Sequence, residues 1–93
     1  MELRQIPVKN TKNTITRNVK EGVIIVFIDQ QSASLLKGSA AVVWKLVNGE
    51  RSISDILEKI LREYRDDDKE IKRFVLEAVS DLKKIRAIYF RKG

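Results

Sequence analysis

The chain has 93 residues and a net charge of +6, a length that suits one small domain and leaves no room for a second core. Hydrophobic residues make up 43% of the sequence and charged residues 34%, which is too apolar for a disordered chain. Cysteine and histidine do not occur. Their absence excludes disulfides, thiolate nucleophiles, imidazole bases and the usual ligands of zinc and haem. We therefore expect no catalytic residue, metal or cofactor.

The sequence shows no segment that could cross a membrane or direct export. Its longest apolar run, Val23 to Ile28, has six residues, whereas a bilayer requires roughly 20. The first residues contain no apolar stretch followed by a small-residue cleavage site. A cytoplasmic protein is expected.

Three short strands are predicted in the first part of the chain. One lies near residues 15–19, the β-branched run 23–28 is too short for a helix, and the chain returns as a third strand over 33–36. An extended basic arm over residues 1–14 precedes this antiparallel meander. Since every position of 23–28 is apolar, both faces of that strand need cover. One face can pack on the helices, and the other requires the docked arm or a second subunit, so a homodimer is one expectation.

Two helices are predicted next, because the apolar period changes from two to 3.6 at residue 39. Ser39 is expected to cap a short, mostly apolar helix over 40–47, with Gly49 as the left-handed residue after its end. Ser52 and Asp55 have the spacing of a capping box, which opens a second, amphipathic helix.

A third helix follows the aspartates at positions 66–68, with Asp68 as its expected N-cap. These carboxylates could instead hold a hard cation, but the glycine-bearing loop and the distal glutamate of a calcium site are missing. The apolar positions of this helix form one stripe that is expected to face the core: Ile71, Phe74, Val75, Ala78, Leu82 and Ile85.

A short last strand is expected over 88–90, and the single tryptophan, Trp44, is expected in the core and not as an exposed stacking platform. The predicted fold of residues 15–93 is a single α+β domain. It consists of a small antiparallel three-stranded sheet followed by three helices, in a winged helix-turn-helix-like order.

Residues 36–49 read LKGSAAVVWKLVNG and are followed by ERSISDI. This stretch resembles the PqqD-like family, named for pyrroloquinoline quinone biosynthesis protein D. The family pattern is approximately Leu-Asn-x-Thr-Ala-x-x-Ile-Trp-x-Leu-x-Asp-Gly before a Thr-initiated helix, and the resemblance covers roughly residues 15–88. The sequence departs from the pattern at Lys37, Ser39, Asn48 and Ala87, which stand in place of Asn, Thr, Asp and Gly.

The resemblance implies a non-catalytic recognition element of ribosomally made, modified peptides. Members of the family hold the leader of a precursor peptide as an added strand against the third strand, alongside the third helix. They present it to a modifying enzyme, often a radical S-adenosylmethionine enzyme. This chain is therefore expected to bind a peptide and to catalyse nothing by itself.

Beside the predicted strand edge, Val79 lies at the margin of the apolar stripe of the third helix, and Leu76 lies well outside it, among cations. A lone exposed leucine needs no explanation, but next to a free edge these residues fit a groove for an extended peptide with apolar anchors and acidic neighbours. The candidate peptide-binding residues are Ser32, Ala33, Ser34, Leu35, Leu36, Lys72, Leu76, Val79, Lys83 and Arg86.

Two other functions remain open from the residues alone. A winged helix-turn-helix of this charge could bind DNA, although the aspartates and Glu70 at the start of its third helix would repel phosphate. The domain could also be a structural subunit whose strand edge recruits another protein without any precursor peptide.

Overall fold

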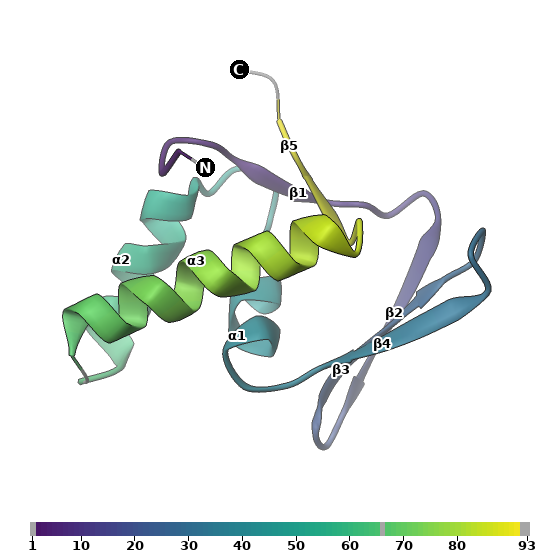
Figure 1. Ribbon diagram of the computed structural model, residues 1–93, viewed down its shortest axis with the longest axis horizontal. Helices are drawn as coiled ribbons and strands as arrows, with labels where there is room; N and C mark the ends of the chain where they lie inside the picture. Colours follow the sequence, from purple (N-terminus) through teal and green to yellow (C-terminus); the bar gives the residue numbers. More distant parts are fainter. Residues whose placement is uncertain (1, 66, 92–93) are drawn as a thin grey trace.

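The computed structural model describes residues 2–65 and 67–91 and confirms the α+β architecture. A three-stranded antiparallel sheet of order β2-β3-β4 projects to one side of the three helices, and β1 and β5 form a second, two-stranded sheet (Figure 1). The elements in chain order are β1 (Pro7–Lys9), β2 (Thr14–Val19), β3 (Gly22–Phe27), β4 (Ser32–Leu36), α1 (Gly38–Leu46), α2 (Ile53–Glu63), α3 (Asp68–Lys84) and β5 (Ile88–Phe90).

The central strand β3 packs one face on the helices. Val23, Ile25 and Phe27 alternate along it and are buried, as a half-covered sheet requires. The residues between them therefore point to the opposite, outer face of the sheet. This places the core on one side of the sheet only.

The arm docks, but not on the sheet. Its strand β1 pairs with β5, with Pro7 opposite Phe90. The carbonyl groups of Leu3 and Gln5 accept hydrogen bonds from the N–H groups of Ser54 and Ile53, at 2.8 and 2.9 Å. The arm thus lies against the start of α2 and the end of the chain.

Two helices begin earlier than predicted, α1 by two residues and α3 by one. Helix α1 begins at Gly38, whose φ of 57° turns the chain directly from β4 into the helix, so Ser39 is not its cap. The residue before it, Lys37, makes no side-chain capping bond. Asp67 and not Asp68 caps α3, because its carboxylate accepts from the N–H of Lys69 at 2.8 Å. The preceding position 66 lies outside the described residues.

The capping box of α2 is confirmed. The Ser52 hydroxyl accepts from the N–H of Asp55 at 3.1 Å, and the Asp55 carboxylate accepts from the N–H of Ser52 at 2.9 Å. Ser52→Ala should lower the free energy of unfolding by about 1 kcal/mol, because it leaves a helix N–H without its partner. Urea unfolding measures this, with Ser54→Ala in the same turn as the control. Equal losses in both variants would show that the cap contributes nothing.

The core stripe of α3 differs from the predicted one. Val79 is fully buried and belongs to it, while Phe74 is 41% exposed and does not. The stripe consists of Ile71, Val75, Ala78, Val79 and Leu82, and Ile85 lies at its margin. The predicted core position of Trp44 is confirmed.

No local sequence pattern marks the residue that lies against Trp44. The ammonium group of Lys9 lies 4.7 Å from the ring centroid, a distance at which a cation is attracted to an aromatic face. Burial lowers the pKa of Lys9 from its ordinary value. The arm is thereby held on the helical core by packing as well as by backbone hydrogen bonds.

Candidate functional site

Strand β4 forms one edge of the three-stranded sheet, and within residues 2–65 and 67–91 no strand pairs with its outer side. Such an edge presents unpaired N–H and C=O groups. Ser34 lies opposite the buried Ile25 and shares its inner face, whereas Leu35 lies opposite Ile24 on the outer face. Edge β4 can therefore offer main-chain hydrogen bonds to an extended chain.

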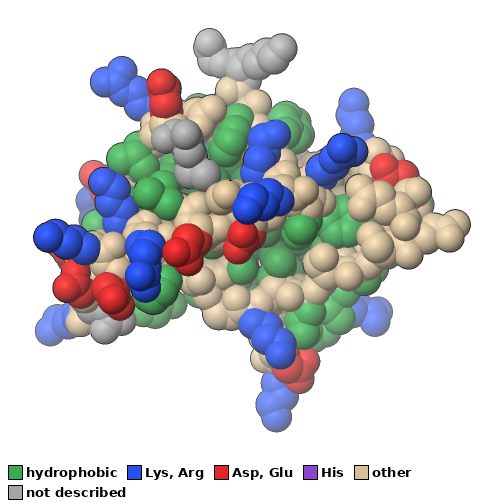
Figure 2. All heavy atoms as spheres, in the orientation of Figure 1, with side chains coloured by type: hydrophobic (Ala, Val, Ile, Leu, Met, Phe, Trp, Pro, Cys, Tyr) green, Lys and Arg blue, Asp and Glu red, His purple; other side chains and the backbone are tan. Residues whose placement is uncertain are grey.

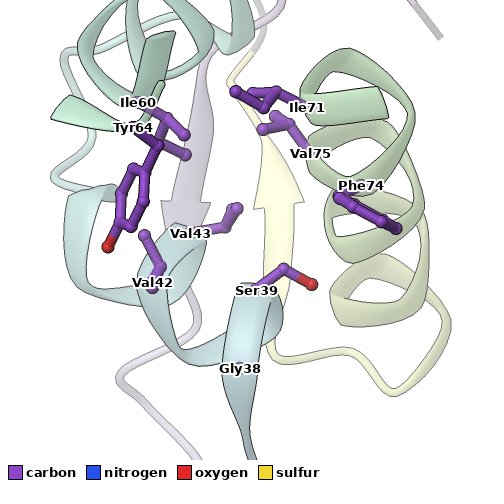
Figure 3. Close-up of a pocket in the computed structure, with 9 residues that line it drawn as sticks. All are labelled: Gly38, Ser39, Val42, Val43, Ile60, Tyr64, Ile71, Phe74 and Val75. Carbon is purple, nitrogen blue, oxygen red and sulfur yellow. The ribbon is translucent and has the colours of Figure 1, made fainter. Parts of the chain in front are cut away.

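This edge leads into an apolar cavity. Beyond Leu36 the chain enters α1, and a cavity of about 280 Å³ opens there between α1, α2 and α3 (Figure 3). Side chains from α1 and α2 line one side and those from α3 the other. The lining residues are Gly38, Ser39, Val42, Val43, Ile60, Tyr64, Ile71, Phe74 and Val75.

Two aromatic residues at the cavity are open to solvent. Phe74 is 41% exposed and Tyr64 is 45% exposed. The guanidinium group of Arg73 lies 5.2 Å from the Phe74 ring and 4.0 Å from the carboxylates of Glu70 and Glu77. Figure 2 shows hydrophobic side chains in the space between α3 and the sheet, bordered by charges of both signs. At the cavity itself, the two exposed rings lie beside an arginine that is paired with two glutamates.

The strand residues predicted for the site lie largely as expected. Ser32, Ala33 and Leu35 are exposed, and Ser34 is half-buried. Leu36 is the exception because it is buried and belongs to the core.

The residues predicted on α3 do not line this cavity. Val79 has no exposed surface and cannot serve as a groove wall, and Leu76 is half-buried against the core. At about 100° per residue, Leu76 lies some 200° around the helix from Phe74 and so faces away from the cavity. Lys83 lies on the side of Leu76, with its ammonium group 5.9 Å from the ring of Phe90 in β5.

Lys72 and Arg86 are exposed, and Lys72 is close to Leu76 in angle around the helix. Gly38 and Ser39, which follow β4, line the cavity together with Phe74, whereas the predicted residues Leu76 and Lys83 lie on another side of α3. Sequence reasoning missed Phe74, Tyr64 and Val42 as lining residues. The only signal was the position of Phe74 at the margin of its stripe.

The carboxylates do not suggest a metal centre. Among residues 2–65 and 67–91, no three acidic side chains gather in an arrangement that could hold a metal ion. In the same part of the chain, no helix is long and apolar enough to span a bilayer.

The order of elements, with an open sheet edge beside the last helix, defines a small α+β domain of the winged helix-turn-helix class. The family described as Coenzyme PQQ synthesis protein D (PqqD) matches residues 22–88. The chain belongs to this family.

Two solved structures share the fold. One is TbiB1 in complex with the TbiA(beta) leader peptide, with a TM-score of 0.76, 14% identity, and coverage of 92% of this chain and 100% of that chain. The other is lasso peptide synthetase B1 complexed with the leader peptide, with a TM-score of 0.72, 15% identity, and coverage of 84% and 92%. A search of curated proteins finds no match to this chain.

Proposed function

We propose that this chain is a peptide-binding domain that holds the leader of a ribosomally made precursor peptide and presents it to a separate modifying enzyme. The observation that carries this proposal is the open edge of β4, which leads directly into an apolar cavity. Membership of the PqqD family supports it, as do two structural neighbours that were each solved with a leader peptide.

The peptide would add to the sheet as a fourth strand. Main-chain hydrogen bonds to β4 supply affinity that is independent of sequence, and side-chain pockets supply specificity. Ser32 and Ser34 are small and lie on the inner face, so they leave room for the side chains of the added strand.

The direction in which the peptide pairs with β4 determines which of its side chains can enter the cavity. All pairs in this sheet are antiparallel, and an antiparallel peptide would have its N-terminal end near Leu36. A large apolar side chain just upstream of the paired segment would then enter the cavity between Val42, Tyr64 and Phe74. The exposed Lys37 next to this point favours an acidic residue beside the anchor.

The domain would contribute recognition and no chemistry, and the reaction would belong to the partner enzyme. That this enzyme uses radical S-adenosylmethionine chemistry stays a prediction from the resemblance. DNA binding is not favoured, because Asp67, Asp68 and Glu70 give the start of α3 the charge that repels phosphate.

Phe74→Ala should weaken peptide binding about 10- to 100-fold, since it removes an aromatic wall of the cavity, and buried aromatic anchors carry much of the energy of such interfaces. A random-peptide library displayed on yeast provides the probe. Peptides enriched on the wild-type protein are labelled, and their affinities are measured by fluorescence anisotropy. We expect them to share a large apolar residue upstream of an extended segment.

Tyr89→Ala is the matched control, because Tyr89 is an aromatic residue of similar exposure, 50%, on β5 away from the cavity. It should leave the affinity unchanged. Backbone amide shifts in NMR spectra should follow β4 and not the other sheet edge, β2. Binding that perturbs β2, or that tolerates Phe74→Ala as well as Tyr89→Ala, would place the peptide elsewhere, and a library without enriched peptides would contradict the proposal.

A further inference from the structure

A second cleft lies between the N-terminal arm and the end of α1, and we call it the arm cleft. Its volume is about 490 Å³. The lining residues are Val8, Lys9, Thr11, Lys45, Val47, Asn48 and Gly49. None of them lines the apolar cavity, to which α1 contributes residues from its first half. Since a helix of nine residues is about 13 Å long, the two sites lie toward opposite ends of α1.

The polar side chains of the arm cleft are donors of hydrogen bonds. Lys9 and Lys45 supply ammonium groups, Thr11 supplies a hydroxyl group and Asn48 an amide. The side-chain oxygen of Asn48 already accepts from two backbone N–H groups of the following turn, at 2.9 and 2.8 Å, which leaves its NH₂ group as a donor. None of the lining residues carries a carboxylate. This set of groups suits an anion and not a cation.

The ammonium group of Lys9 is held in place but not neutralised. Lys9 is half-buried, and its ammonium group lies 4.7 Å from the ring centroid of Trp44. In the part of the chain that the structure describes, neither Lys9 nor Lys45 has a carboxylate oxygen within 4.0 Å. An anion that enters the cleft therefore meets a cation whose position is already fixed, so binding costs less conformational entropy than pairing with a free lysine.

Further cations surround the arm cleft. Lys12 is adjacent to it in sequence. The guanidinium groups of Arg51 and Arg91 donate to carbonyl groups at the end of α1 and in the turn after it, at 3.0 and 3.3 Å. Glu50 is the one carboxylate next to a lining residue in sequence, and a helix C-terminus carries only about half a negative charge. The cations therefore exceed the negative charge at this end of α1.

We propose that the arm cleft docks an acidic segment of a partner protein, with one carboxylate side chain of that segment inside the cleft beside Lys9 and Lys45. Several cations around one cleft suit a chain that carries several carboxylates, because complementary charges steer and align such a segment. Nucleic acid fits less well, since no aromatic ring among the lining residues is available for stacking with bases.

The partner is a protein other than the precursor peptide. A leader paired with β4 would enter the apolar cavity, and that cavity shares no residue with the arm cleft. Both sites can therefore be occupied at once. Under the proposed function, on which this one identification rests, the partner is the modifying enzyme.

A fluorescein-labelled hexaglutamate peptide is the probe, and fluorescence anisotropy measures its affinity for the full chain at constant salt. We expect a dissociation constant of about 0.1–1 mM, because exposed charge pairs contribute little each. Lys45→Glu should weaken binding about tenfold or more, since it replaces an attraction by a repulsion. Lys20→Glu is the matched control. It makes the same change in net charge at an exposed position between β2 and β3, and it should weaken binding less than about threefold.

Lys9→Met tests the ammonium group that lies over Trp44. Methionine keeps an apolar stem of similar length and removes the charge, so binding should weaken about threefold or more. Circular dichroism melts confirm that each variant folds. In NMR spectra, hexaglutamate should shift the backbone amide signals of Thr11, Asn48 and Gly49.

Equal losses in Lys45→Glu and Lys20→Glu would overturn the proposal, because binding would then depend on net charge alone. Displacement of hexaglutamate by a peptide enriched from the library would also overturn it, since both would occupy one site. So would tighter, Lys45-dependent binding of a single-stranded DNA of about 12 nucleotides at the same salt, which would assign the cleft to phosphate. The hexaglutamate measurement needs no leader peptide, so its failure leaves the proposed function intact, whereas a library without enriched peptides contradicts the proposed function alone.

Discussion

Replacing Leu82 with alanine is expected to lower the free energy of unfolding by about 2–5 kcal/mol. Leu82 is 1% exposed and is the last residue of the buried stripe that α3 packs against the core. Truncation removes buried apolar surface and leaves a cavity that rigid neighbours fill only in part. Urea unfolding followed by circular dichroism measures the loss, provided that the free energy of unfolding depends equally steeply on urea concentration in the variant and the wild type.

Phe74→Ala, on the same helix, provides the comparison. Because Phe74 is 41% exposed, its truncation should cost less than about 1 kcal/mol. The larger aromatic residue should thus matter less for stability than the smaller leucine, while it matters more for peptide binding. Equal losses in the two variants would mean that Phe74 closes over the cavity and belongs to the core.

The contrast between these two residues shows where sequence reasoning fails on α3. Spacings of three and four fit a stripe through Phe74 and Ile85 as well as one through Val79, and the two differ only by a rotation of the helix. What selects between them is the position of the neighbouring elements. That position follows from contacts distant in sequence, so an amphipathic pattern alone does not determine it.

Local patterns predicted the elements themselves well. The run of β-branched residues in β3 and the capping box at Ser52 are properties of neighbouring residues, and both are confirmed. The pairing of β1 with β5 and the approach of Lys9 to Trp44 join segments far apart in the chain. No local signal marks them. The sequence leaves either the docked arm or a second subunit as the cover of the sheet, and the arm lies instead against β5 and the start of α2.

The candidate site also combines one feature that local sequence predicts, the strand edge, with one that it does not predict, the cavity. The free edge of β4 follows from counting strands in a meander, and it was predicted. The cavity requires α1, α2 and α3 to meet at given distances, and no periodicity contains that information. An exposed Phe74 alone does not indicate a binding site. It does so here because Val42 and Tyr64 lie across the cavity from it.

Gly22→Ala is expected to lower the free energy of unfolding by about 3 kcal/mol, and with it the melting temperature by roughly 12–24 °C. Gly22 begins β3 with a φ of 155°, and a Cβ atom at this position would lie 1.9 Å from the carbonyl oxygen of Leu36. That oxygen belongs to the backbone of β4, which cannot yield as a flexible side chain would. The alanine methyl group would force β3 and β4 apart where the sheet meets α1.

Gly38→Ala is the control, because it measures the cost of a left-handed backbone without a steric clash. Gly38 has a φ of 57°, but a Cβ atom there would meet nothing within 4 Å, so only the cost of a left-handed alanine applies, about 1–2 kcal/mol. The Gly22 variant should melt at the lower temperature of the two, as measured by circular dichroism. If the two variants melt together, the strands accommodate the methyl group, and the close approach of β3 to Leu36 does not fix the position of the β4 edge.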